Sequence, residues 1–177
     1  PTAMKTEAPA GWIKGTDIET YLRFLYVLSP ENNQIYKYER LANRYTSPAE
    51  YNVNGDLEGD VDMAIDGNIF LLKEGGEVMR LLRGEVKPFT IRHLPEEALK
   101  NATKIYKVFD GHLYFLDPVS GRVIVATPGG GGGEGSYVQQ YILEGDQIGE
   151  LKDIFVDEEE TKMYLIDDKR IHVVDLR

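Results

Sequence analysis

Cysteine is absent from this 177-residue sequence, and several other features are scarce. Without cysteine the chain has no disulfide bond, no thiolate zinc site and no cysteine nucleophile. Tryptophan occurs once, at Trp12, where we expect it to anchor an irregular N-terminal arm (residues 1–15) on the body of the protein. No apolar run approaches the roughly 18 residues of a membrane-spanning helix. We therefore expect no membrane insertion by this chain.

Basic residues are scarce relative to acidic ones. The 20 Lys and Arg against 30 Asp and Glu give a net charge of −10. Nucleic-acid binding uses cationic side chains that displace counterions from phosphate, so this balance argues against a nucleic-acid partner. The charge is compatible with binding a cation or a basic protein surface, and also with a simple role in solubility. The compartment stays open, with a bacterial extracytoplasmic location favoured.

The sequence does contain a pattern of strand, tight turn and strand that occurs four times, most clearly in residues 109–125. An aromatic residue marks the second strand of each unit, at intervals of 44, 44 and 50 residues: Tyr26, Phe70, Tyr114 and Tyr164. The first apolar residue of the third strand keeps step: Ile35, Val78, Val123 and Ile171. Units of about 40–50 residues with four short strands are typical of β-propeller blades.

We therefore predict an all-β fold, a β-propeller of four blade-like repeats of about 44 residues within residues 16–177. The blades are expected at about residues 17–54, 55–94, 102–144 and 145–177. The second strands are apolar at consecutive positions, which requires burial on both faces, as between stacked blades. Residues 88–92 are expected to form the fourth strand of the second unit. Residues 94–101 carry the only helix signals, with Pro and Glu in the first turn.

The fourth unit has room for only three strands after residue 150, so the last blade is predicted to lack its outer strand. An unpaired edge there invites association. Three resolutions stay open: the N-terminal arm supplies the missing strand and closes a four-bladed ring, the chain is the C-terminal portion of a larger propeller, or two copies join into one ring. The expected state is accordingly a monomer or a ring-completing homodimer.

Residues 110–117, with Ser120 and Gly121, resemble the blade signature of quinoprotein-type (PQQ-like) propellers. The tryptophan that usually closes that signature is missing, and residues 66–72 form a degenerate copy. The resemblance implies the propeller fold. It implies no quinone chemistry, because no ligand residues can be matched, and we expect no cofactor.

Histidine and glycine offer little evidence of a catalytic centre. His93, His112 and His172 fall at different blade positions without metal-ligand spacing, so we expect ordinary surface or hydrogen-bonded roles. The Gly-rich run at residues 128–135 is expected to be a flexible connector. A phosphate cradle would require a helix after the loop and usually a lysine in it, and the sequence has neither there.

Carboxylates are the concentrated chemistry of this chain. The loops that enter each blade and the turns between second and third strands lie at the same end of a propeller, and here they are acidic. Our candidate binding residues are Asp60, Asp62, Glu74, Asp117 and Asp153, with Asp62 and Asp153 near the axis. No residue is assigned to catalysis or to a metal. Residues 157–160 fall at the opposite end and are expected to be a solvated hairpin tip.

Three functions are compatible with these features. The favoured one is a non-enzymatic interaction module that binds a protein or peptide partner through its acidic, loop-rich end. The second is a propeller-type hydrolase or lyase in which Asp60, Asp62 and Asp153 hold a cation. The third is an architectural or sensor domain, as the C-terminal portion of a larger bacterial protein.

Overall fold

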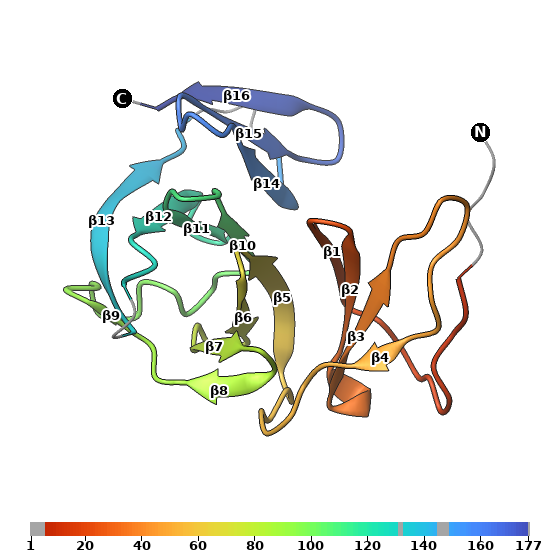
Figure 1. Cartoon of the computed structure of the whole chain (residues 1–177). Helices are drawn as coiled ribbons and strands as arrows, with labels where there is room; N and C mark the ends of the chain where they lie inside the picture. The colour runs from red at the N-terminus through yellow and green to blue at the C-terminus, as the bar shows by residue number, and fades with distance from the viewer. Residues whose placement is uncertain (1–5, 131–132, 145–148, 177) are drawn as a thin grey trace.

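The computed structural model describes residues 6–130, 133–144 and 149–176, which fold into four small sheets arranged as a four-bladed β-propeller (Figure 1). Each blade is an antiparallel meander that starts at the centre. The first blade contains β1 (Asp17–Tyr21), β2 (Phe24–Ser29), β3 (Gln34–Glu39) and β4 (Ala49–Glu50). The second contains β5 (Asp60–Ile65), β6 (Asn68–Lys73), β7 (Val78–Leu82) and β8 (Glu85–Lys87).

The third blade contains β10 (Lys104–Lys107), β11 (Leu113–Asp117), β12 (Arg122–Ala126) and β13 (Glu134–Ile142). The fourth contains β14 (Asp153–Val156), β15 (Lys162–Ile166) and β16 (Ile171–Asp175). The only helical turn in the described part of the chain is the 3-10 segment η1 (Pro30–Asn32), which connects β2 to β3. None of the described helices is long or apolar enough to cross a membrane.

The predicted fold class is confirmed, and so is the repeat that predicted it. The four marker aromatics all lie on second strands, namely β2, β6, β11 and β15. Within the described residues β16 pairs only with β15, so the last blade lacks its outer strand as predicted.

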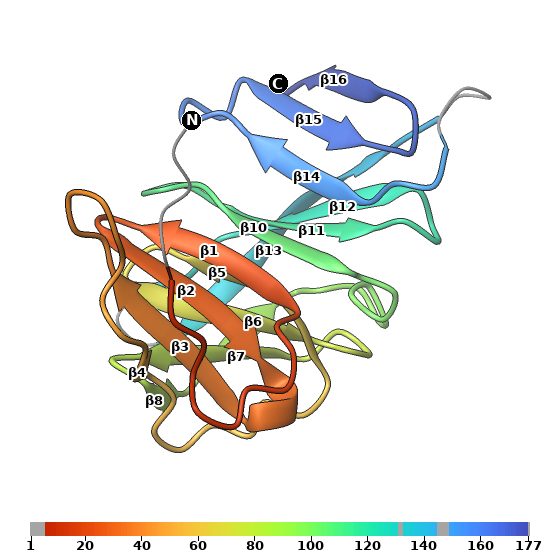
Figure 2. The same cartoon turned by 90° about the vertical axis from the view of Figure 1, so that its right-hand side faces the viewer.

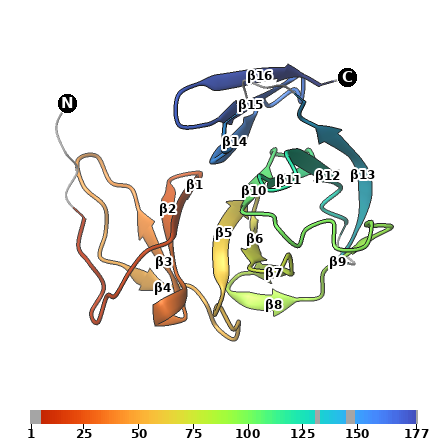
Figure 3. The ribbon, with the colours of Figure 1, turned by 180° about the vertical axis from the view of Figure 1, so that it is seen from behind.

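The predicted fourth strand of the second unit is wrong. β8 fills that place, because Gly84 (φ +83°) turns the chain back directly after β7. Pro88 then follows, and its missing N–H ends the ladder. Within residues 88–92, β9 (Thr90–Arg92) instead pairs in parallel with the start of β13 in the next blade (Figure 3).

The predicted helix at residues 94–101 is also wrong. The segment is a series of turns, in which the amides of Ala98, Lys100 and Ala102 donate to carbonyls three residues earlier. Glu97 has a left-handed φ of +54°, which a continuous helix excludes. A two-turn helix is marginal by itself, and burial of Ala98 and Leu99 decides the local conformation here.

Three apolar clusters join the blades in sequence. Tyr26, Leu28 and Ile35 of blade 1 pack with Met63, Ile69 and Leu71 of blade 2. On the other face of blade 2, Phe70 and Leu72 pack with Phe115 and Ile124 of blade 3. Blade 3 then uses Tyr114, Leu116 and Val123 against Ile154 and Met163 of blade 4. Consecutive apolar residues in β6 and β11 are thus explained by burial on both faces.

The two outward faces at the ends of this series differ. On blade 1, Trp12 of the arm lies 5.7 Å from the ring of Tyr36, and the Tyr38 hydroxyl donates to Glu7 O at 3.1 Å. The outward face of blade 4 is exposed instead, at Phe155, Ile166, Ile171 and Val173. The sheet β14–β16 covers blade 3 with its other face (Figure 2). Residues 6–15 therefore lie on blade 1, and for them the expectation that the arm completes blade 4 is wrong.

Candidate functional site

Polar residues occupy equivalent positions on the four inner strands. Asp17, Asp62, Lys104 and Asp153 pair across their blades with Leu28, Leu72, Leu116 and Ile166, which follow the step of the repeat. The inner edge of each blade has no further strand, so its amide groups need other acceptors.

Carboxylates from the preceding blade satisfy two of these amides. Asp17 Oδ2 accepts from Met63 N at 3.0 Å, and Asp62 Oδ2 accepts from Ile105 N at 2.7 Å. Asp62 Oδ1 also pairs with Lys104 Nζ at 2.8 Å. In blade 4 the equivalent amide, Ile154 N, donates to Asp153 of its own strand at 2.8 Å. These contacts give the axial carboxylates a structural role in joining blades.

Two carboxylates near the axis, Asp62 and Glu19, have a raised pKa. Burial raises the pKa of Asp62 to about 7, with Asp17 adding to the effect and Lys104 opposing it. Burial raises the pKa of Glu19 to about 7 as well, and Asp17 and Asp153 add to it. The axis can therefore exchange protons near neutral pH.

Asp60 is the most unusual of the candidate residues. Its side chain lies at the start of β5, beside a bulge, and the residue is only 3% exposed. Neither carboxylate oxygen has a hydrogen-bond partner among the described residues. Burial raises its pKa to about 7, Lys73 opposes the shift, and Asp56 and Glu77 add to it. An unpaired buried carboxylate is destabilising when it is ionised.

Glu74 and Asp117 lie apart from the axis. Glu74 is exposed in the turn between β6 and β7, where its amide donates to Gly59 O at 2.8 Å, next to Asp60 in sequence. Asp117 is fully buried, accepts from Ser120 N at 2.9 Å and pairs with Arg122 Nε at 3.0 Å, so it stabilises a turn. The five candidates therefore divide into an axial pair, an entry-loop pair and a turn residue.

An acidic groove lies at the entry-loop end, between η1 and the loop that precedes β5. It has a volume of about 470 Å³, and Glu31, Asp56 and Glu58 line it together with Asn33. Asn33 holds the two sides together, because its Oδ1 accepts from Leu57 N at 2.8 Å. We call this feature the entry groove. Within the described parts of the chain, no three Asp, Glu or His side chains are grouped as ligands for a metal ion.

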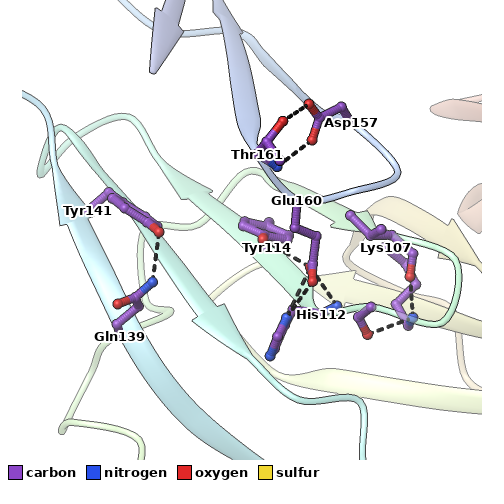
Figure 4. Close-up of polar contacts among 10 residues, drawn as sticks. Lys107, His112, Tyr114, Gln139, Tyr141, Asp157, Glu160 and Thr161 are labelled. Atoms are coloured by element: carbon purple, nitrogen blue, oxygen red, sulfur yellow. Dashed lines mark hydrogen bonds and ion pairs between the residues drawn. The ribbon is translucent and has the colours of Figure 1, made fainter. Parts of the chain in front are cut away.

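A second polar cluster lies at the opposite end of the blades, where the turns between first and second strands lie; we call this the hairpin end. The cluster lies between blades 3 and 4 (Figure 4). His112 Nδ1 contacts both Glu160 oxygens, at 3.0 and 2.9 Å, and the Tyr114 hydroxyl donates to Glu160 Oε1 at 3.0 Å. Burial acts to raise the pKa of Glu160, but hydrogen bonds from the backbone and ring of His112 and from Tyr114 outweigh it and lower that pKa. The prediction of a solvated tip at residues 157–160 missed Glu160. The repeat could have indicated the contact, because it places the hairpin turns of consecutive blades at one end.

No protein-family model matches the sequence, and no curated protein matches it. Among solved structures, a chain of the nidogen–laminin complex has a TM-score of 0.56 and 15% identity, over 81% of this chain and 54% of that one. Virginiamycin B lyase from Staphylococcus aureus gives 0.53 and 12%, over 90% of this chain and 55% of its own. A streptogramin B lyase gives 0.52 and 16%, over 90% and 53%.

The chain has the β-propeller fold. At these identities the likeness to solved structures shows the fold alone, and the chain spans about half the length of the structures it resembles. The resemblance to PQQ-like repeats in particular stays a prediction.

We predict that Asp60→Asn raises the free energy of unfolding at pH 8 by about 1–3 kcal/mol and raises it by less at pH 5. The folded-state pKa of about 7 lies above the ordinary value of 3.8, so the folded protein binds a proton that the unfolded chain has lost between these values. Stability therefore falls as pH rises through this window, and asparagine removes that loss. Urea unfolding at both pH values measures the difference.

Asp117→Asn is the matched control, because Asp117 is equally buried but fully paired. We expect it to destabilise the protein at both pH values, since Arg122 loses its partner. An effect of Asp60→Asn that is the same at pH 5 and pH 8 would contradict an unpaired carboxylate at this position.

Proposed function

We propose that this protein is a non-enzymatic β-propeller interaction module that binds a basic segment of a protein partner at its entry-loop end. The observation that supports the proposal is the entry groove, which three carboxylate residues line and no lysine or arginine lines among the described residues. Carboxylates arranged in a concave site attract lysine and arginine side chains and speed their association.

A basic residue beside this groove is already engaged with the backbone. Lys73 Nζ donates to Asp56 O at 2.7 Å and to Glu58 O at 3.0 Å, and these two bonds fix the loop that precedes β5. Glu31 and Glu58 are both exposed, and no salt bridge engages either one within the described chain. Their carboxylates are therefore available to a cationic side chain of a partner.

We predict that the double change Glu31→Gln and Glu58→Gln weakens binding of a tetralysine peptide by about tenfold. Each exposed ion pair is worth up to about 1 kcal/mol, and about 1.4 kcal/mol corresponds to one factor of ten. Binding is measured by fluorescence anisotropy at low and physiological salt, and we expect salt to weaken it.

Glu158→Gln with Glu159→Gln is the matched control, because it removes the same charge from exposed residues at the hairpin end. The groove is the binding site if this control keeps wild-type affinity. An equal loss in both double variants would mean that net charge, rather than the groove, attracts the peptide.

A second candidate function is acid–base catalysis at His112. Its support is the Glu160 carboxylate, which holds His112 Nδ1 and leaves Nε2 for proton transfer, as in catalytic His–carboxylate pairs. A solved structure with TM-score 0.52 and 12% identity is a catalytically inactive variant of virginiamycin B lyase with quinupristin. The likeness supports only the choice of test substrate.

This alternative predicts that the protein breaks down quinupristin, which mass spectrometry detects. His112→Ala would then abolish the reaction, and Glu160→Gln would slow it by about 10²-fold or more, the usual contribution of an oriented base. Intact quinupristin after prolonged incubation with the wild-type protein would contradict the alternative.

A further inference from the structure

A separate pocket lies at the hairpin end, between blades 2 and 3, where no candidate residue was expected. Its volume is about 270 Å³. The turn between β5 and β6 contributes Asp66, and β6 begins with Asn68 at the pocket. β7 contributes Arg80 and Leu82, and the loop after β12 contributes Gly129 and Gly130. We call it the Arg80 pocket. It is distinct from the entry groove, which lies at the other end of the blades.

Arg80 is a buried cation without a counterion. The residue is 8% exposed, and its Nε is fully buried with no hydrogen-bond partner in the described structure. None of the described carboxylates forms a salt bridge with its guanidinium. A desolvated charge with an unused donor is costly, and a bound anion would remove that cost.

The carboxylate that lines the same pocket is already occupied. Asp66 Oδ1 accepts from the backbone amide and the side chain of Asn68, at 3.1 and 3.2 Å. Asp66 Oδ2 pairs with the buried Lys107 Nζ at 3.2 Å. Asp66 therefore fixes the turn and neutralises Lys107, and Arg80 keeps its own charge.

Glycine lets the loop of blade 3 approach the guanidinium. Gly133 has a left-handed φ of +79°, and a Cβ on it would lie 2.1 Å from Pro88 O and 3.3 Å from Arg80 Nη2. Gly129 is equally constrained, since a Cβ there would lie 2.4 Å from Glu134 O. A Cβ on Gly130 would meet nothing within 4 Å, so the loop leaves open space beside it. Gly129 and Gly133 thus form a wall of the pocket that a larger residue at either position would disrupt.

We propose that the Arg80 pocket binds the carboxylate group of a small aliphatic ligand. A guanidinium presents paired N–H groups that match a carboxylate in a bidentate contact. A single negative charge fits best, because Asp66 lines the pocket and would repel a dianion such as phosphate. Leu82, which is 40% exposed, and the buried Phe70 supply an apolar wall for a short chain.

The test uses the full chain labelled with ¹⁵N and butyrate as the probe. We expect the Arg80 Nε–Hε resonance to move saturably with butyrate, and the melting temperature to rise with butyrate concentration. Chloride at equal ionic strength should do neither. The proposal would be overturned if the Arg80 Nε–Hε resonance does not shift with butyrate. It would also be overturned if inorganic phosphate shifts this resonance and butyrate does not.

Arg80→Met assigns the resonance and supplies a second measurement. It removes the unpaired charge and keeps most of the volume, so we expect a melting temperature above wild type without butyrate and no stabilisation with it. Arg80→Lys serves if the Met variant fails to fold, and it should bind butyrate several-fold more weakly. Arg83→Met, an exposed change in the next turn, should respond as wild type does. Equal stabilisation of wild type and Arg80→Met by butyrate would overturn the assignment.

Discussion

Face-to-face packing between neighbouring blades is the constraint on which the rest of this structure depends. Blades 2 and 3 are apolar on both faces, so each needs a covering surface on both sides. Three clusters satisfy this condition between blades 1 and 4, and the Asp17 and Asp62 carboxylates complete it by binding the inner-edge amides of the next blade. The blades are therefore fixed in register, and the loops at both ends are positioned by that register.

This geometry separates two kinds of chemistry. The entry-loop end presents the acidic groove around Glu31 and Glu58, which suits cationic partners. The hairpin end contains the buried Arg80 and, one blade interface further on, the His112–Glu160 pair. Each of these three sites is formed by residues of two consecutive blades, so no single blade contains one. Loss of blade packing would therefore remove the sites together with the fold.

The repeat made the fold predictable, because Tyr26, Phe70, Tyr114 and Tyr164 report a periodic burial that any blade requires. The errors fall where a non-local contact overrides a local pattern. The β9 pairing with β13 depends on the next blade, and burial of Leu99 overrides the helix signals around it. Arg80 and Glu160 were missed for the same reason: their environments come from segments about 50 residues away. Of the five predicted carboxylates, Asp62 and Asp153 lie on inner strands near the axis, and Asp117 lies at the end of β11, where it accepts from Ser120 N.

Blade 4 gives the most direct test of blade packing, because only one of its faces is covered in the described structure. Hydrogen exchange of backbone amides at neutral pH, measured for each residue by NMR, distinguishes covered from uncovered sheets. We expect slow exchange at Ile105 and throughout β11, and markedly faster exchange in β15 and β16. Exchange in β15 and β16 as slow as in β11 would contradict the account, since it would mean that blade 4 is covered on both faces.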